Sequence, residues 1–267
     1  MMYSKNNEVL FGKRVDVIMH SFLLIGQSNM AGRGFLEDAL PINTDHIYTL
    51  RNGRWQKMFR PINPDRSFSG VSLGESFAEC YAKKYNVNVG LICCADGGTS
   101  LEQWSTEGVL YENAVCQAKL AQRTSDIMGV LWHQGESDCL ETLYLTYQER
   151  FEVLMKSLRK ELNLQDIPFL LGGLGDFLRD CSFDGNLKKY QNVNNALTNI
   201  AQQNKMVGFV SAKGLTANPD LLHFNSKSLY EFGKRYFEEF EKLYNMNKIE
   251  TRGLKNSDIL RTEMENL

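Results

Sequence analysis

Residues 21–34 read SFLLIGQSNMAGRG, an apolar run followed at once by a polar turn that contains glycine. A short apolar run without alternation is typical of a strand that is buried on both faces of a parallel sheet. Gly26 permits a sharp turn where the run ends. Ligands of an open parallel sheet bind beyond the carboxyl ends of its strands. The polar residues that follow Gly26 are therefore the first candidates for a functional site.

Four more apolar runs follow this one, and longer amphipathic stretches separate them. The runs occupy residues 89–95, 127–133, 168–173 and 207–211. The stretches 71–85, 108–123, 142–162, 188–204 and 226–244 repeat apolar residues every three or four positions, which is the spacing of helices. Regular alternation of strands and helices indicates a parallel sheet covered on both faces. The sequence therefore predicts an α/β fold, a flavodoxin-like three-layer α/β/α sandwich around a mainly parallel sheet of five strands.

Three regions depart from this alternation. Residues 47–58 place Asn52-Gly53 between two short alternating segments, which predicts a β-hairpin, interpreted as an excursion near the site. Residues 1–20 form an N-terminal extension to a single domain at 21–245. Residues 246–267 alternate charges and predict a polar tail, either solvated or a short helix docked by Ile259 and Leu260.

The composition excludes several classes of partner. The chain has 267 residues, of which 43% are hydrophobic, and its 30 basic and 32 acidic residues are scattered and give a net charge of −2. The chain therefore has no strong electrostatic field that would attract nucleic acid or an anionic membrane. Charged residues interrupt the first twenty positions, so no secretory signal is recognised, and no Asn-x-Ser/Thr sequon occurs. We expect a cytoplasmic protein whose six cysteines stay reduced.

A serine and a histidine are the strongest catalytic candidates. Ser28 follows the first strand, and a serine hydroxyl needs a base within hydrogen-bond reach to act as a nucleophile. His223 could be that base, since Asp220 three positions earlier can fix its tautomer. The alternatives are a turn or N-cap serine, and an exposed loop histidine beside an aspartate that begins a helix.

Two further strand ends carry candidate groups. Gly97 and Gly98 allow the backbone to approach a substrate and to direct an N–H at an oxyanion, or they form only a tight turn. Gln134 offers a side-chain amide donor for the same purpose, or it is a buried structural residue. Glu136 and Asp138 could be acids, caps or metal ligands. The paired histidines of a zinc helix are missing, so we expect neither a metal nor another cofactor.

Four motifs in order resemble one family. GQSNMAGRG, then GGTS with Trp104 shortly after, then WHQGESD, then D-x-x-H resemble the SGNH-type carbohydrate esterases, which include acetylxylan esterases and sialate O-acetylesterase-like proteins. The resemblance covers residues 21 to about 244. It implies the SGNH fold, Ser28 as nucleophile and His223 as base. For the acid it offers Asp220 or Glu136, and we favour Asp220 because it is close to His223 in the sequence.

The resemblance also implies an oxyanion hole and a reaction. Its donors would be the backbone N–H groups of Ser28 and Gly98 and the side chain of Gln134. This chain departs from the family's pattern at Leu221, where glycine is usual, and at Gln134, where many relatives have asparagine. The implied reaction is removal of O-acetyl groups from a small-molecule or oligosaccharide acetyl ester through an acetyl-enzyme.

Polar and aromatic residues near these motifs suggest a pocket that can stack against a sugar ring and form hydrogen bonds with it. We expect Asn29, Arg33, Arg51 and Trp104 to contact the sugar there. Two other functions stay open: hydrolysis of lipid or thioester acyl chains on the same fold, and carbohydrate binding without catalysis. The identity of the sugar, the position of its acetyl group and the oligomeric state do not follow from the sequence.

Overall fold

Seven strands form one sheet, in the order β3-β2-β4-β1-β5-β6-β7. The structure is a computed structural model that describes residues 19–182 and 187–265, with side chains as far as Met246. The expected N-terminal extension lies outside the described residues, except that Met19 and His20 already belong to the first strand. The strands are β1 (Met19–Gly26), β2 (Ile47–Arg51), β3 (Arg54–Lys57), β4 (Asn88–Cys93), β5 (Asp126–His133), β6 (Phe169–Gly172) and β7 (Val207–Val210).

The predicted three-layer α/β/α sandwich is confirmed, but the predicted count of five strands is wrong. The five expected strands pair in parallel in the order β4-β1-β5-β6-β7, which is the flavodoxin-like order. The hairpin supplies the other two strands, since β2 pairs in parallel with β4 and β3 pairs antiparallel with β2. A hairpin of alternating residues can continue a sheet whose edge strand leaves backbone groups unpaired.

The hairpin lies at the edge of the sheet, so its interpretation as an excursion near the site is wrong as well. Arg51 at its turn donates a hydrogen bond to the carbonyl of Pro61 (2.6 Å) and lies over the ring of Phe59. It does not line the cleft that contains Ser28.

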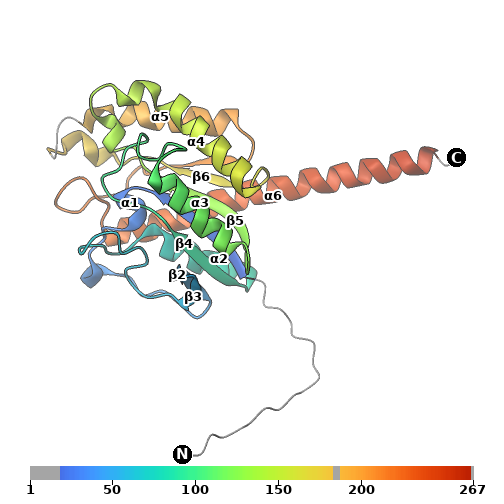
Figure 1. Ribbon diagram of the computed structural model, residues 1–267, viewed down its shortest axis with the longest axis horizontal. Coiled ribbons are helices and arrows are strands. Elements are labelled where there is room, and N and C mark those ends of the chain that lie inside the picture. The colour runs from blue at the N-terminus through green and yellow to red at the C-terminus, as the bar shows by residue number, and fades with distance from the viewer. Residues whose placement is uncertain (1–18, 183–186, 266–267) are drawn as a thin grey trace, which may run out of the picture.

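Helices cover both faces of the sheet (Figure 1). On one face lie α3 (Val109–Ala121), α4 (Tyr147–Leu162) and α5 (Tyr190–Gln203), and on the other lie α2 (Leu73–Tyr85) and α6 (Ser226–Glu265). A short helix, α1 (Ser28–Ala31), follows β1. Single 3₁₀ turns occupy Leu36–Asp38, Ser137–Cys139, Leu143–Thr146, Asp176–Asp180 and Leu187–Lys189.

The central strand β1 joins the two cores. Its side chains alternate, so that Leu23 and Ile25 pack in the core with α3, α4 and α5, whereas Phe22 and Leu24 pack with α2 and α6. All four are at most 1% exposed. Burying each such side chain stabilises the fold by about 1.5–3 kcal/mol. This strand therefore sets the position of every neighbouring strand and of the loops that follow them.

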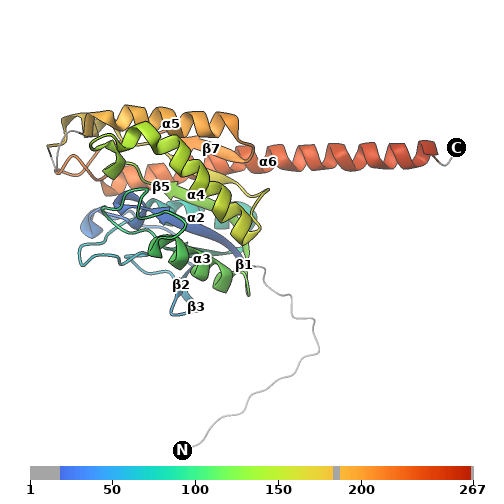
Figure 2. The same cartoon turned by 45° about the horizontal axis from the view of Figure 1, so that its top comes forward.

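The C-terminal region differs from the expected tail. It does not form a separate short helix, because α6 continues without a break to Glu265 and projects beyond the sheet (Figures 1 and 2). The side chains of Ile259 and Leu260 lie outside the described residues. No helix in residues 19–182 and 187–265 is both long and apolar enough to span a membrane.

Gly233 of α6 offers a test of how closely this helix packs on α2. A Cβ built at Gly233 would collide with the carbonyl oxygen of Leu73, while Ser76 Oγ donates to the carbonyl of Tyr230 across the same contact (2.8 Å). Alanine favours helices by about 1 kcal/mol over glycine. We nevertheless expect Gly233→Ala to lower the free energy of unfolding by about 1–3 kcal/mol in urea titrations, because the helices must separate.

The neighbour Lys234, whose side chain is 44% exposed, provides the control for this substitution. Lys234→Ala should change the free energy of unfolding by less than about 0.5 kcal/mol. A Gly233→Ala protein that is more stable than the parent would show that α6 is not held against α2 at this point.

Candidate active site

Ser28 begins α1 directly beyond the carboxyl end of β1. The N–H of Gln27 donates to the carbonyl of His133 at the end of β5 (2.9 Å). Gly26 has φ 129°, and a Cβ there would collide with the same carbonyl oxygen, so only glycine fits. The chain therefore leaves the strand in a tight turn, and Ser28 lines a cleft beyond the carboxyl ends of the central strands.

Ser28, His223 and Asp220 form a chain of hydrogen bonds. His223 Nε2 lies 3.0 Å from Ser28 Oγ, and His223 Nδ1 lies 2.7 Å from Asp220 Oδ2. A carboxylate only accepts, so Nδ1 carries the proton and Nε2 presents its lone pair to the serine hydroxyl. Asp220 Oδ1 also accepts the backbone N–H groups of Leu222 (2.9 Å) and His223 (3.0 Å). The arrangement is that of a nucleophile, a base and an orienting acid.

Asp220 stays ionised over a wide pH range. Its partial burial opposes ionisation, but the hydrogen bonds from the His223 side chain and from the N–H groups of residues 222 and 223 outweigh burial and lower its pKa to about 2. Leu221, the departure from the family's usual glycine, has φ 52°. The loop thus keeps a left-handed residue at this position even though leucine rarely adopts that conformation.

Glu136, the alternative acid, does not bond to His223. Its Oε1 accepts a hydrogen bond from Asn29 Nδ2 (2.5 Å), and its side chain is 3% exposed. Of the two carboxylates that the sequence left open, the structure brings only Asp220 to the imidazole.

Three residues that line the cleft, Ser28, Gly98 and Gln27, carry N–H donors that could serve a substrate. Within the described part of the chain, the backbone N–H groups of Ser28 and Gly98 donate to no protein acceptor. Gln27 Oε1 accepts the N–H groups of Gly135 (3.2 Å) and Ser137 (3.4 Å), which fixes the side-chain amide and leaves its Nε2 without a bond to a described residue. Gln27 lines the cleft together with Gly98. These groups could stabilise an oxyanion.

The expected role of Gln134 in the oxyanion hole does not agree with its position. Its side chain is fully buried, and Nε2 donates to the carbonyl of Thr99 (3.0 Å) and to Asp138 Oδ2 (2.6 Å). The same carboxylate accepts the N–H of Leu101 (2.9 Å) and pairs with Arg150 (2.7 Å). Gln134 therefore holds the loop that carries Gly98 from behind, because both of its N–H donors are already used.

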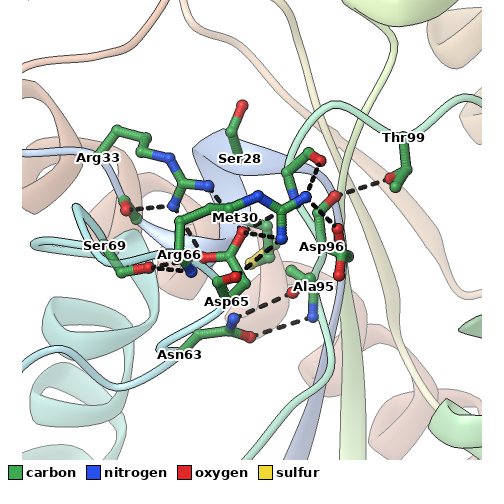
Figure 3. Close-up of polar contacts among 12 residues, drawn as sticks. Ser28, Met30, Arg33, Asn63, Asp65, Arg66, Ser69, Ala95, Asp96 and Thr99 are labelled. Atoms are coloured by element: carbon green, nitrogen blue, oxygen red, sulfur yellow. Dashed lines mark hydrogen bonds and ion pairs between the residues drawn. The ribbon is translucent and has the colours of Figure 1, made fainter.

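An ion-pair network supports the other side of the same loop (Figure 3). Arg33 makes two bonds to Asp65, at 3.0 and 2.7 Å, and Asp65 Oδ2 accepts the N–H of Gly97 (2.9 Å). Arg66 pairs with Asp96 (2.9 Å). Burial of Asp65 opposes its ionisation, but bonds from Arg33, a serine hydroxyl and Gly97 lower its pKa. Arg33 lines the cleft as expected, with much of its hydrogen-bonding capacity used inside the protein.

Three of the four expected sugar contacts are wrong, because Arg51, Trp104 and Asn29 do not line the cleft. Trp104 is fully buried, donates its indole N–H to Thr99 Oγ1 (3.1 Å) and packs edge-on against Trp132. Asn29 is 1% exposed, and neither it nor Trp104 lines the cleft. Apolar residues surround the indole ring, and the Asn29 amide is bonded to the Glu136 carboxylate and to backbone groups of Leu222 and Phe224.

The cleft has a volume of about 490 Å³ and includes residues that the sequence did not single out. Gln27 could have been found, since it adjoins Ser28 in the same motif. Arg66 and Phe68 belong to an irregular loop, residues 61–70, which gives no local signal for a position near the site. The residues that line the cleft are Gln27, Ser28, Arg33, Arg66, Phe68, Gly97, Gly98, Ser100, Gln103, Glu136, Ser137, Leu140, Leu187, Leu222 and His223.

Known proteins are similar to this chain in both sequence and fold. A "probable carbohydrate esterase" of Arabidopsis thaliana is 29% identical over 241 residues, which cover 79% of this chain and 86% of that protein. Its X-ray structure superposes with a TM-score of 0.73 at 28% identity, covering 84% of this chain and 98% of the other.

Two more distant structures share the fold alone. NanS has a TM-score of 0.69 at 16% identity, covering 86% of this chain and 98% of its own. A carbohydrate acetylesterase from Xanthomonas citri has a TM-score of 0.62 at 17% identity, covering 85% of this chain and 56% of its own. The sequence pattern of the family described as "Carbohydrate esterase, sialic acid-specific acetylesterase" matches residues 18–242. The chain therefore belongs to this family of carbohydrate esterases and is a carboxylic ester hydrolase.

Proposed function

We propose that this protein removes O-acetyl groups from a carbohydrate by serine catalysis, with Ser28 as nucleophile, His223 as base and Asp220 as acid. The observation that carries the proposal is the unbroken chain of contacts from Ser28 Oγ to His223 (3.0 Å) and on to Asp220 (2.7 Å). A serine hydroxyl with a base in reach, and a base oriented by a third group, is the arrangement required for nucleophilic catalysis.

In the first step, Ser28 Oγ attacks the acetyl carbonyl carbon while His223 Nε2 takes the hydroxyl proton. Asp220 stabilises the imidazolium that forms. The carbonyl oxygen becomes an oxyanion and accepts hydrogen bonds from the N–H groups of Ser28 and Gly98 and from Gln27 Nε2. The intermediate then collapses, the bond to the sugar oxygen breaks, and His223 returns the proton to that oxygen.

In the second step, water releases the acetyl group from Ser28. His223 takes a proton from the water as its oxygen attacks the acetyl carbon, and the same donors hold the second oxyanion. Ser28 leaves with the proton that His223 returns. The products are the deacetylated sugar and acetate, and the free enzyme is restored.

The cleft favours a small polar substrate. Phe68, 68% exposed, presents an aromatic face that can pack against the C–H face of a sugar ring, and Ser100 and Gln103 can bond hydroxyl groups. The description of the matching family as a sialic acid-specific acetylesterase also points to acetylated carbohydrates. These features favour acetyl sugars over long acyl chains, which would need an extended apolar groove.

Replacement of the nucleophile tests the proposal directly. The parent should release acetate from at least one of three substrate classes: acetylated xylo-oligosaccharides, O-acetyl sialic acids and simple acetyl monosaccharides. Ser28→Ala should lower kcat by about 10⁶-fold, because the variant has no group to form the acyl-enzyme. A fluorophosphonate should label the parent at Ser28, as peptide mass spectrometry would show.

Ser157→Ala on α4 is the matched control and should keep the parent's rate. Equal hydrolysis of p-nitrophenyl acetate by the parent and Ser28→Ala would rule out Ser28 as the nucleophile. Labelling at Ser28 combined with failure on all three sugar classes would indicate a different acyl ester as the substrate.

The two glutamines near the site should differ in their effects. Gln27→Ala removes a donor to the oxyanion and should lower kcat by about 100-fold with little change in KM. Gln134→Ala should instead lower thermal stability, because it leaves the buried carbonyl of Thr99 without its donor and removes one of the donors to the buried carboxylate of Asp138. If Gln134→Ala loses more kcat than Gln27→Ala and keeps its stability, Gln134 and not Gln27 is the side-chain donor to the oxyanion.

Asp220→Asn should separate catalysis from acid sensitivity. The amide keeps the shape of the side chain but favours the wrong histidine tautomer, so kcat should fall by about 10⁴-fold. Because folding lowers the pKa of Asp220 from 3.8 to about 2, its charge stabilises the folded state above pH 3.8, and this stabilisation is lost as the pH falls toward 2.

Urea unfolding of the parent and of Asp220→Asn should therefore converge in stability over that pH interval. A stability difference that stays constant from neutral pH down to about pH 2 would contradict the assigned ionisation.

A further inference from the structure

The side chain of Asn29 connects the turn that carries Ser28 to the loop that carries His223. Asn29 Oδ1 accepts the N–H of Phe224 (3.0 Å), and Nδ2 donates to the carbonyl of Leu222 (3.3 Å). These two residues flank His223. A single amide, adjacent in sequence to the proposed nucleophile, thus holds the backbone on both sides of the proposed base.

The bonds of Asp220 cannot do the same. Asp220 accepts from the N–H groups of Leu222 and His223, so all of its contacts with the imidazole and its backbone lie within one loop. They orient the ring relative to that loop. The distance between the loop and Ser28 needs a contact that crosses to α1, and Asn29 supplies one.

Glu136 determines which way the Asn29 amide faces. Asn29 Nδ2 lies 2.5 Å from Glu136 Oε1, and the two residues are 1% and 3% exposed. A flipped amide would place its oxygen against this carboxylate and against the carbonyl of Leu222, and its NH₂ against the N–H of Phe224. All three contacts would then be repulsive, and repulsion of this kind is strong where water is excluded.

The surroundings of Glu136 concentrate its interaction on Asn29. His133 Nδ1 lies 3.8 Å from Glu136 Oε1, but complete burial lowers the pKa of His133, so the imidazole stays neutral near pH 7. Among the residues that the structure describes, neither Glu136 Oε2 nor His133 Nδ1 has a hydrogen-bond partner. The bond to Asn29 is therefore the main polar contact of this buried carboxylate.

We propose that Asn29 and Glu136 are positioning residues that set the distance between Ser28 and His223. Asn29 holds the histidine loop against α1, and Glu136 keeps the Asn29 amide in the one orientation that can do so. Neither side chain takes part in the proton transfers. This inference rests on the proposed function, because it assigns the two residues a part in the same serine chemistry.

A cycle of three variants tests the pair. Asn29→Asp places two carboxylates at hydrogen-bond distance and removes the donor to Leu222. Glu136→Gln keeps the shape but removes the charge that orients the amide. The double variant combines the two substitutions and reverses the polarity of the pair. Its carboxylate at position 29 can accept from both the N–H of Phe224 and the side-chain amide at position 136.

We expect the losses to appear in kcat and not in KM. A displacement of about 1 Å between reacting groups can cost about 100-fold in rate, so Asn29→Asp should lose about that much and Glu136→Gln about 10-fold, with KM within about twofold. The double variant should be about 10-fold faster than Asn29→Asp, since the repulsion between two carboxylates is replaced by a hydrogen bond and the carboxylate at position 29 can again hold the N–H of Phe224 without being displaced. The rate of Ser28 labelling by a fluorophosphonate should follow the same order.

Asn194→Asp is the matched control. Asn194 bonds the N–H (2.7 Å) and the carbonyl (3.0 Å) of Leu174 in the same manner, away from His223. It should lower the Tm and leave kcat unchanged. If it lowers kcat as much as Asn29→Asp does, loss of stability explains the effect and the proposal fails.

Two other results would also overturn the proposal. One is an Asn29→Asp protein with the parent's kcat, and the other is a double variant no faster than Asn29→Asp, as expected if Glu136 were itself the triad acid. If Asn29→Asp does not fold, an unchanged kcat in Glu136→Gln would by itself overturn the proposal. Failure of the parent itself to label at Ser28 would instead reject the proposed function.

Discussion

The end of β1 packs so closely against the end of β5 that no side chain fits between them, and the site is organised around this contact. Gly26 lies against the carbonyl of His133, which accepts the N–H of Gln27, and the Gln27 side chain accepts the N–H of Gly135 in return. One backbone bond and one side-chain bond join two polar segments that are more than a hundred residues apart in the sequence. Ser28 then begins α1 with its N–H free of a protein acceptor among the described residues.

The segment after β5 supports the site without touching the reacting atoms. Gln134 and Asp138 hold the loop of Thr99 and Leu101 in place behind Gly98. Glu136 orients Asn29, which holds the loop of His223. Burying a carboxylate is costly unless donors compensate it. Asp138 accepts bonds from Gln134, Leu101 and Arg150, whereas Glu136 has Asn29 as its hydrogen-bond donor among the described residues. The site is therefore rigid where the proposed mechanism needs fixed distances.

Much of this arrangement could be predicted from the sequence, since it follows from local pattern. The five apolar runs became parallel strands because branched residues without alternation suit a strand buried on both faces. Asn52-Gly53 formed its hairpin because these two residues suit a two-residue turn between antiparallel strands. Where that hairpin would pair could not be predicted, because the choice of a sheet edge depends on which backbone groups are left unpaired after the other strands associate.

The sequence by itself determined the order of strands and helices, the turn after β1, and the closeness of Asp220 to His223, because each depends on residues near one another in the chain. Only the tertiary structure decided which polar side chains face the cleft. Gln134, Asn29 and Trp104 are residue types that occur in binding sites. Here their side chains already contact buried polar groups or apolar neighbours inside the protein. Gln27, Arg66 and Phe68 reach the cleft because loops from separate strands converge there. Residue type states what a side chain can bond, whereas its neighbours in space determine which bonds remain available for a substrate.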